Sequence, residues 1–356
     1  MIILAIDTSC DETAVSVTQN TKIVSNIIWS QASLHSSFGG VMPSLAQRQH
    51  KERIDWVVSK AIKQSGISIE KVDAIAVTIG NGLGIALGVG IGKAKELSVK
   101  HNKPLIPVSH TEAHLLSSFC VPVSTKKEKV DISFPALGLV LSGGTTVLTI
   151  INSIGEYQIL AETPDDALGE ALDKGARLLG LGYPGGAILE KLAREGNSKR
   201  YKLPIPLQSD RIKNRFSYSG LKTAFVRLFN ELKEPNRQDI ADLAASFQSV
   251  AFDHVIKVLD YQIKTSDLKF KDILFGGGVA NNVEIKKRLR KLLKKYNIKL
   301  HVPYTKKLNG DNAGMIGVCA YLKSKNLSET DLIEKYGGID NINLVDRNPR
   351  LKLSTS

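Results

Sequence analysis

The chain has 356 residues, which is long for a single hydrophobic core, so two lobes are expected. Its hydrophobic content of 42% and charged content of 23% are ordinary for a globular protein, and no apolar run reaches the ~18 residues that suggest a membrane span. The 48 lysines and arginines exceed the 35 acidic residues by 13. That excess favours an anionic partner such as nucleic acid, the alternative being a proteome that is basic throughout.

The cysteines and the first residues indicate the compartment. Cys10, Cys120 and Cys319 are scattered and form no Cys-x-x-Cys pair, so disulfides are not expected and a reducing cytoplasm fits. The first residues read directly as a buried strand rather than as a signal or transit segment. A cytoplasmic protein without a membrane anchor is therefore expected.

The N-terminal part alternates strand, turn, strand and helix. Apolar segments predict strands at 2–6, 14–18, 22–25 and 74–79, with a polar turn at 7–11. Helical periodicity predicts helices at about 47–65 and 84–100.

The strand–turn–strand pattern recurs further along the chain. Strands are predicted at 136–141, 146–152, 157–161 and 272–275, with glycine turns at 142–145 and 275–279 and a helix from about 282. We therefore expect an N-terminal lobe at 1–105, a C-terminal lobe at 106–325 and a surface tail at 326–356. Residues 126–129 read as a surface insertion.

Two basic clusters carry part of the charge. One helix bears Lys286, Lys287, Arg288, Arg290, Lys291, Lys294 and Lys295 around a stripe of Leu289, Leu292, Leu293 and Tyr296. A second cluster flanks a predicted loop: Lys199, Arg200, Lys202, Arg211, Lys213 and Arg215. Such faces either contact phosphates or are simply solvated.

His110 and His114 are four residues apart, so on a helix both imidazoles lie on one face and can bind one divalent metal. The stretch resembles the zinc-peptidase motif His-Glu-x-x-His, but Glu112 lies roughly 200° around the helix from His110 and cannot act as that base. The pair predicts either a metal site that is not a peptidase site or two histidines without a ligand role. Asp311, in a polar loop before an apolar helix, is either that helix's N-cap or the missing metal ligand.

The glycine turns suit a nucleotide. A Ser-Gly-Gly-Thr hairpin exposes backbone N–H groups and hydroxyls to a phosphate, and a strand–glycine–helix element admits a nucleoside. Their order is that of the actin-like ATPase fold, in which two phosphate loops precede an adenosine site; neither a Rossmann nor a P-loop fingerprint occurs. Asp166, Glu170 and Asp173 lie on a predicted helix, where they either contact ribose or a metal or are solvated.

Taken together, these segments resemble the tRNA N6-adenosine threonylcarbamoyltransferase family in its bacterial form, the TsaD type. The resemblance covers roughly residues 1–320 and rests on motifs at 6–13 (IDTSCDET), 39–43 (GGVMP), 110–114 (HTEAH), 142–144 (SGG), 169–174 (GEALDK), 216–224 (FSYSGLKTA), 277–279 (GGV) and 311–313 (DNA). It implies an α/β actin-like ATPase fold of two RNase H-like lobes around a nucleotide cleft.

The resemblance also implies roles for particular residues. His110, His114 and Asp311 would hold a divalent metal, Fe²⁺ in preference to Zn²⁺. Asp11 and Glu12 match acidic residues implicated in catalysis. The positions that match binding of threonylcarbamoyl-AMP, or of ATP or ADP in the same cleft, are Leu141, Ser142, Gly143, Gly144, Thr145, Asp173, Gly186, Glu190 and Asn282.

The implied reaction transfers the threonylcarbamoyl group to N6 of the adenosine next to the anticodon of tRNA. The implied partners are tRNA, an inactive paralogue of the TsaB type, a small ATPase of the TsaE type and an enzyme that makes the adenylate. The alternatives are a non-catalytic nucleotide-binding paralogue and a small-molecule kinase of the same fold, in which the histidine pair would be idle.

The chain departs from the family pattern at several positions. The family usually has His at the position of Thr145 and Glu at that of Ser44. Pro and Ala are usual where Asn81 and Asn281 stand, and Cys-Thr where Asn309-Gly310 stands. Val140 occupies the position of a metal-binding Tyr in archaeal and eukaryotic members, which leaves Asp311 as the third protein ligand.

Overall fold

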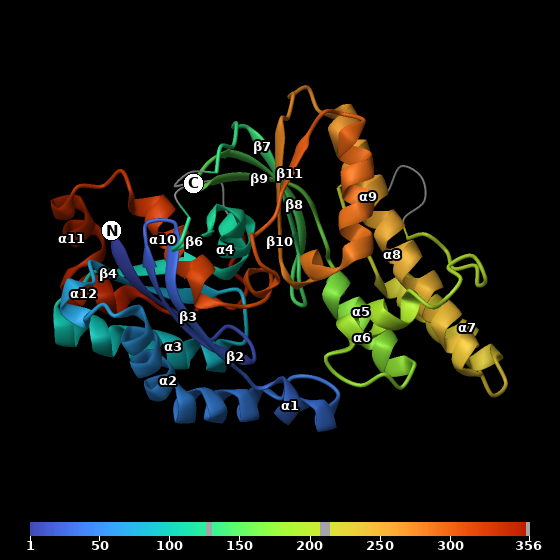
Figure 1. Cartoon of the computed structure of the whole chain (residues 1–356), viewed down its shortest axis with the longest axis horizontal. Helices are drawn as coiled ribbons and strands as arrows, with labels where there is room; N and C mark the ends of the chain where they lie inside the picture. The colour runs from blue at the N-terminus through green and yellow to red at the C-terminus, as the bar shows by residue number, and fades with distance from the viewer. Residues whose placement is uncertain (126–129, 207–213, 354–356) are drawn as a thin grey trace.

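The structure, a computed structural model, describes residues 1–125, 130–206 and 214–353. Two sheets, each flanked by helices, form two lobes that lie side by side (Figure 1). The expected insertion at 126–129 and two members of the second basic cluster, Arg211 and Lys213, lie outside the described residues. None of the described helices combines the length and apolarity needed to cross a membrane.

The first sheet has six strands in the order β5-β4-β1-β2-β3-β6. They are β1 (Ile2–Asp7), β2 (Glu12–Gln19), β3 (Lys22–Ser30), β4 (Ala74–Gly80), β5 (Leu105–Ser109) and β6 (Val121–Pro122). The β1–β2–β3 meander is antiparallel, whereas β4 and β5 continue the sheet in parallel beyond β1.

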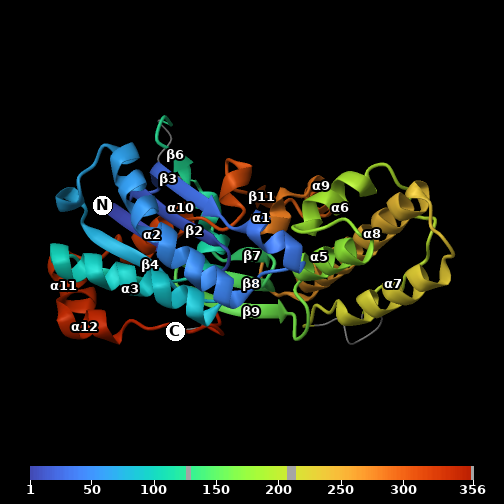
Figure 2. The same ribbon diagram turned by 90° about the horizontal axis from the view of Figure 1, so that it is seen from below.

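Helices cover both faces of this sheet because β1 is apolar on both. Leu4 and Ile6 face α2 (Pro43–Ser65) and α3 (Gly84–His101), which run across the sheet in Figure 2. Ile3 and Ala5 face the opposite side, where α10 (Ala313–Ser324) packs. The short α1 (Ala32–His35) precedes α2, and Pro43 occupies the first turn of α2, where its missing N–H costs nothing.

The second sheet has five strands in the order β11-β10-β7-β8-β9. They are β7 (Ala136–Leu141), β8 (Thr146–Ser153), β9 (Glu156–Glu162), β10 (Asp272–Gly276) and β11 (Lys299–His301). An antiparallel β7–β8–β9 meander is again extended by parallel strands, so both lobes repeat one topology.

The helices of the second lobe bury one large core against this sheet. They are α5 (Leu168–Leu178), α6 (Gly185–Ala193), α7 (Ser219–Glu231), α8 (Arg237–Thr265) and α9 (Val283–Lys294). In α9 the apolar stripe is buried at Leu289, Leu292 and Leu293, as the sequence predicts. Figure 1 shows α7 and α8 extending away from the sheets.

Helix α4 (His110–Leu116) lies between the two sheets. Its buried residues Ala113, Leu115 and Leu116 share one core with Ile3 and Ala5 of the first sheet and with Val140 and Leu274 of the second. A helix of seven residues is not stable alone, so packing from both lobes fixes its position.

The division of the chain follows the sheets. Strands β5 and β6 belong to the first sheet, and α10 packs on β1 and β2. We propose that the first lobe comprises residues 1–122 with α10, so that the expected boundary at 105/106 moves past α4.

The segment after α10, where the sequence predicts a surface tail, contains two helices in its described part. It forms α11 (Glu329–Tyr336) and α12 (Gly338–Leu344), and α12 packs against α3. Residues 346–353 then run beside β4, where Asn348 N donates to Ile79 O at 2.6 Å. We call this segment the C-terminal strap.

Candidate metal and nucleotide site

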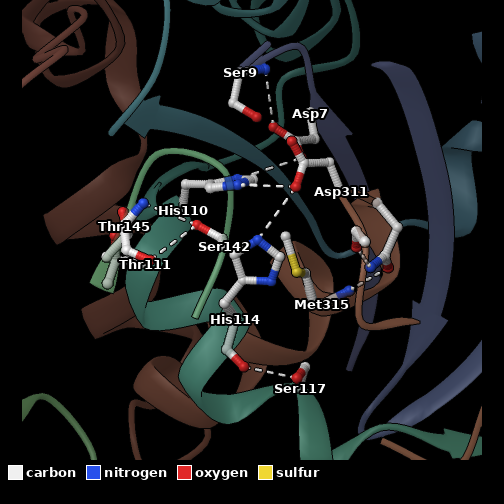
Figure 3. A network of polar contacts seen from close by, with 12 residues as sticks. Asp7, Ser9, His110, Thr111, His114, Ser117, Ser142, Thr145, Asp311 and Met315 are labelled. Carbon is white, nitrogen blue, oxygen red and sulfur yellow. Dashed lines mark hydrogen bonds and ion pairs between the residues drawn. The ribbon is translucent and has the colours of Figure 1, made fainter. Parts of the chain in front are cut away.

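The histidine pair and the final aspartate meet between the lobes. His110 and His114 project from the same side of α4, with ring centroids 4.5 Å apart. Asp311 Oδ1 lies 3.3 Å from His110 Nε2 and 3.2 Å from His114 Nε2 (Figure 3). One donor atom from each of the three side chains lies within 4.8 Å of the others. Two imidazoles and one carboxylate facing each other are a donor set that suits Fe²⁺ or Zn²⁺.

The structure separates the two roles that the sequence left open for Asp311. The N-cap of α10 is Asn312, whose side chain accepts from Met315 N at 3.1 Å. Asp311 is therefore not needed to begin the helix, and its carboxylate turns toward the histidines.

The three side chains shift one another's pKa values. Burial would raise the pKa of Asp311, but His110 and His114 outweigh it and hold that pKa well below its usual range. Burial would lower the pKa of His110, yet Asp311 and Asp7 raise it well above its usual value. For His114, burial and the neighbouring His110 lower the pKa.

Asp7 is a site residue that the sequence did not single out. It ends β1, and its Oδ2 lies 3.5 Å from His110 Nδ1, on the side of the ring away from Asp311. A carboxylate behind a metal-binding histidine orients the ring and makes it a better ligand. The sequence signal that could have identified Asp7 is a carboxylate directly after a predicted buried strand.

Glu112 confirms the argument against a peptidase. Its Oε1 accepts from Tyr157 Oη at 2.9 Å and its Oε2 pairs with Lys323 Nζ at 2.8 Å. It therefore points away from the face that carries His110 and His114, as the helical spacing predicts.

The acidic turn after β1 carries Asp11 and Glu12 near enough to Asp311 for its charge to act on Glu12. Burial raises the pKa of Glu12 well above its usual value, and the charges of Asp11 and Asp311 add to the effect. Burial similarly raises the pKa of the Cys10 thiol, again with contributions from Asp11 and Asp311. The turn thus concentrates negative charge where a proton or a cation would relieve it.

The second turn, at 142–145, forms the predicted tight hairpin. Ser142 N donates to Thr145 O at 2.8 Å, and Thr145 N donates to Ser142 Oγ at 3.0 Å. No other part of the described chain comes within 4 Å of a Cβ built at Gly143 or Gly144, so their backbone is open to a ligand. Figure 3 shows Ser142 and Thr145 beside His110.

The third turn packs closely against α4 and β7 at two of its glycines. A Cβ at Gly276 would lie 2.0 Å from His114 O, and one at Gly277, whose φ is 92°, would lie 2.4 Å from Leu141 O. Only glycine allows these approaches, which bring β10 against α4 and the end of β7. Gly278 alone has open space around it.

The other expected nucleotide residues join helices of the second lobe. Asp173 Oδ1 accepts from Gly186 N at 2.7 Å, which ties α5 to α6. Glu190 Oε1 accepts from Val283 N at 2.9 Å, which ties α6 to α9. Asn282 caps α9 and donates to Gln248 Oε1 at 2.8 Å.

The pKa of Asp173 shows that the charge of the acidic turn reaches α5 in the second lobe. Burial raises the pKa of Asp173, and the charge of Asp11 from the first lobe raises it further, whereas hydrogen bonds from Gly186 and Gly185 lower it.

Of the three acids expected on one helix, only Glu170 and Asp173 lie on α5. Asp166 precedes it and pairs instead with Lys174 at 2.7 Å and Lys222 at 2.5 Å.

Two of the departures from the family pattern contact one another. Asn309 Nδ2 donates to Asn281 Oδ1 at 2.9 Å, which links the third glycine turn to the loop that carries Asp311. Asn81 accepts from Thr111 Oγ1 at 2.7 Å and donates to Leu351 O at 2.6 Å. Val140 is buried within β7.

Comparisons with known proteins show the family of the chain. The sequence model of the family "tRNA N6-adenosine threonylcarbamoyltransferase" matches residues 22–318. The chain is 43% identical over 324 residues to the protein of that name from Mycoplasma capricolum, covering 91% of this chain and 98% of the relative. It is 42% identical over 328 residues to that from Trichlorobacter lovleyi, covering 91% and 92%.

Among solved structures, full-length HypF in its phosphate- and nucleotide-bound form matches with a TM-score of 0.55 at 14% identity, over 92% of this chain and 56% of HypF. The class is thus an α/β protein with the actin-like ATPase fold, as expected from the order of its turns. Within that class, the chain belongs to the tRNA N6-adenosine threonylcarbamoyltransferase family.

Proposed function

We propose that this protein transfers the threonylcarbamoyl group of threonylcarbamoyl-AMP to N6 of the adenosine 3′-adjacent to the anticodon, in tRNAs that read codons starting with A. The observation that carries the proposal is the meeting of His110, His114 and Asp311 beside the acidic turn and the open Gly143–Gly144 backbone. Membership of a transferase family supports the reaction class.

In this proposal each group has a defined task. The N–H groups of the 142–145 turn bind the phosphate of the adenylate and stabilise it as it leaves. N6 of the adenosine attacks the carbamoyl carbon, the new C–N bond replaces the C–O bond to phosphate, and AMP departs. Glu12 or Asp11 takes the proton from N6, and the raised pKa of Glu12 suits a general base.

His110, His114 and Asp311 hold one divalent metal in the proposal, Fe²⁺ in preference to Zn²⁺. When bound, such an ion supplies Lewis-acid polarisation of the carbamoyl carbonyl or a binding point for the threonyl end. Asp7 keeps the His110 ring in its ligating orientation.

We also propose the partners that the family resemblance implies. These are tRNA, an inactive paralogue of the TsaB type, a small ATPase of the TsaE type and the enzyme that supplies threonylcarbamoyl-AMP. We also propose that the protein acts in the cytoplasm, where a tRNA substrate is present. The net charge of +13 supports a polyanionic substrate.

The test is nucleoside mass spectrometry on tRNA from a host depleted of its own enzyme. The intact chain, expressed with its native partners, should restore threonylcarbamoyladenosine, whereas His110→Ala and Asp311→Ala should not. Asp311→Ala should also lose bound metal. His101→Ala, a change at the end of α3, is the matched control and should restore the nucleoside. A folded intact chain that restores none with its native partners, or an active Asp311→Ala variant, would overturn the assignment.

A further inference from the structure

The metal-bearing helix has a second polar face that the reaction does not use. Glu112 lies on that face and is only 3% exposed. Both of its oxygens are engaged, with Tyr157 Oη at 2.9 Å and Lys323 Nζ at 2.8 Å. A buried carboxylate with two such partners is held in one place, because leaving either oxygen unpaired would cost the desolvation of the charge.

The two partners come from different lobes. Tyr157 belongs to β9 in the second sheet, and Lys323 belongs to the last turn of α10 in the first lobe. Glu112 therefore joins α4 to both lobes at once, in a polar network within the otherwise apolar core that surrounds α4.

Helix α10 contacts both faces of α4. Asp311 comes just before its first turn and meets His110 and His114 on the front of α4, while Lys323 in its last turn meets Glu112 on the back. A rotation of α4 about its axis would strain the contacts at both points. Because α4 has only two turns, its rotation is set by its contacts with both lobes, to which these polar contacts add direction beyond the apolar packing of Ala113, Leu115 and Leu116.

We propose that Glu112 is a positioning residue for the metal site: through Tyr157 and Lys323 it fixes the rotation of α4, and with it the directions of His110 and His114. The inference rests on the metal site proposed above. Partners that hydrogen-bond a metal ligand directly change affinity about 10–100-fold when they are replaced, which is the upper range for a residue that acts through the helix.

The experiment titrates the purified full-length chain with Co²⁺ and Zn²⁺ against a chromophoric chelator and records the visible absorption of bound Co²⁺. Glu112→Ala should weaken binding by up to about 10–100-fold, the range for a lost direct partner of a metal ligand, and alter the Co²⁺ spectrum. Glu112→Gln should fall between it and the intact chain, since the amide oxygen still accepts from Tyr157 while the ion pair is lost. Tyr157→Phe removes the hydrogen bond to Glu112, together with the one that Tyr157 Oη accepts from Gly155 N at 3.1 Å. It keeps the ion pair with Lys323, so it should give a smaller loss with the same direction of spectral change.

The matched control is Tyr201→Phe. Tyr201 Oη also donates to a carboxylate, that of Asp239, at 2.9 Å, but within the helical part of the second lobe. It should leave affinity and spectrum unchanged. If Glu112→Ala fails to fold because Lys323 is left unpaired, the double variant Glu112→Gln with Lys323→Met removes both charges and should still weaken binding.

Three outcomes decide the matter. Weakened binding with an altered spectrum in the Glu112 and Tyr157 variants supports the inference. Unchanged affinity and spectrum in folded Glu112→Gln and Tyr157→Phe would overturn it while leaving the metal site intact. An intact chain that binds neither Co²⁺ nor Zn²⁺ would overturn the metal site itself, and this inference with it.

Discussion

Among single residues, Asp11 and Glu12 are the two acceptors proposed for the N6 proton, and the pH dependence of the reaction tests which of them acts. Burial and then Asp11 raise the pKa of Glu12, so a reaction that needs ionised Glu12 is lost as pH falls through that raised value. Asp11→Asn removes one of these causes. If Glu12 is the base, the acid limb of kcat/KM should move to lower pH while activity persists.

In the same assay, Glu12→Gln should lower kcat about 10²–10⁴-fold, the usual contribution of a general base. Abolished activity in Asp11→Asn, with Glu12→Gln still active, would assign the base to Asp11 instead. Substrate binding serves as the control, since both variants keep the volume of the side chain they replace.

Residue spacing predicted which side chains share a face of α4, but not which residues of other elements contact them. The i, i+4 relation of His110 and His114 fixes their common face, and it also fixes Glu112 on the other. By contrast, Asp7, Tyr157 and Lys323 reach the site only through the fold, across separations that no local pattern encodes.

At the scale of elements, apolar strands next to glycine or polar turns were the most predictable parts. Strand β7 occupies the predicted residues 136–141, and α3 ends one residue beyond its predicted end. The long helix α8 was not predicted: its residues 241–248 are buried without a break and so show no single apolar stripe, although the buried positions from Ala251 to Gln262 follow helical spacing. Its capping box, formed by Asn236 and Asp239, was the signal that could have revealed it.

The C-terminal strap gives a prediction for an element. Asn81 connects the strap, through Leu351 O, to Thr111 on α4. Asn81→Ala removes both bonds, so unfolding free energy should fall by about 1–3 kcal/mol, the range for a lost partner of buried polar groups. The strap should also detach more readily, and trypsin should cut faster after Arg347 and Arg350, which are exposed.

The matched control for this prediction is Asn341→Ala. Asn341 also holds backbone carbonyls, those of Glu334 and Gly337, but between α11 and α12 rather than at the strap. Its loss should leave cleavage at Arg347 and Arg350 unchanged. Equal cleavage rates in the Asn81 variant and the intact chain would show that the strap does not depend on this side chain.

At the scale of the whole molecule, the basic residues gathered on α9 predict where tRNA binds. Helix α9 presents exposed Lys287, Lys291 and Lys294, while Arg288 is engaged by Glu284 and Asp253. Its Lys286 has a pKa lowered by burial and by the nearby Lys306 and Arg290, so the basic face continues into the loop that leads to Asp311. A polyanion on this face would extend toward the metal site.

Replacing Lys287, Lys291 and Lys294 by Gln should therefore weaken tRNA binding and flatten its salt dependence. Each lost phosphate contact removes roughly 0.7–0.9 from the slope of log K against log salt concentration. A control triple, Lys63, Lys71 and Lys100 to Gln, makes the same change in net charge on exposed positions of the first lobe. If both triples reduce the slope equally, RNA responds to total charge and α9 is only a solvated face. A smaller slope in the α9 triple alone, with metal binding intact, would instead place the RNA along α9. The reason is that only a local contact releases counterions at one face and not at the other.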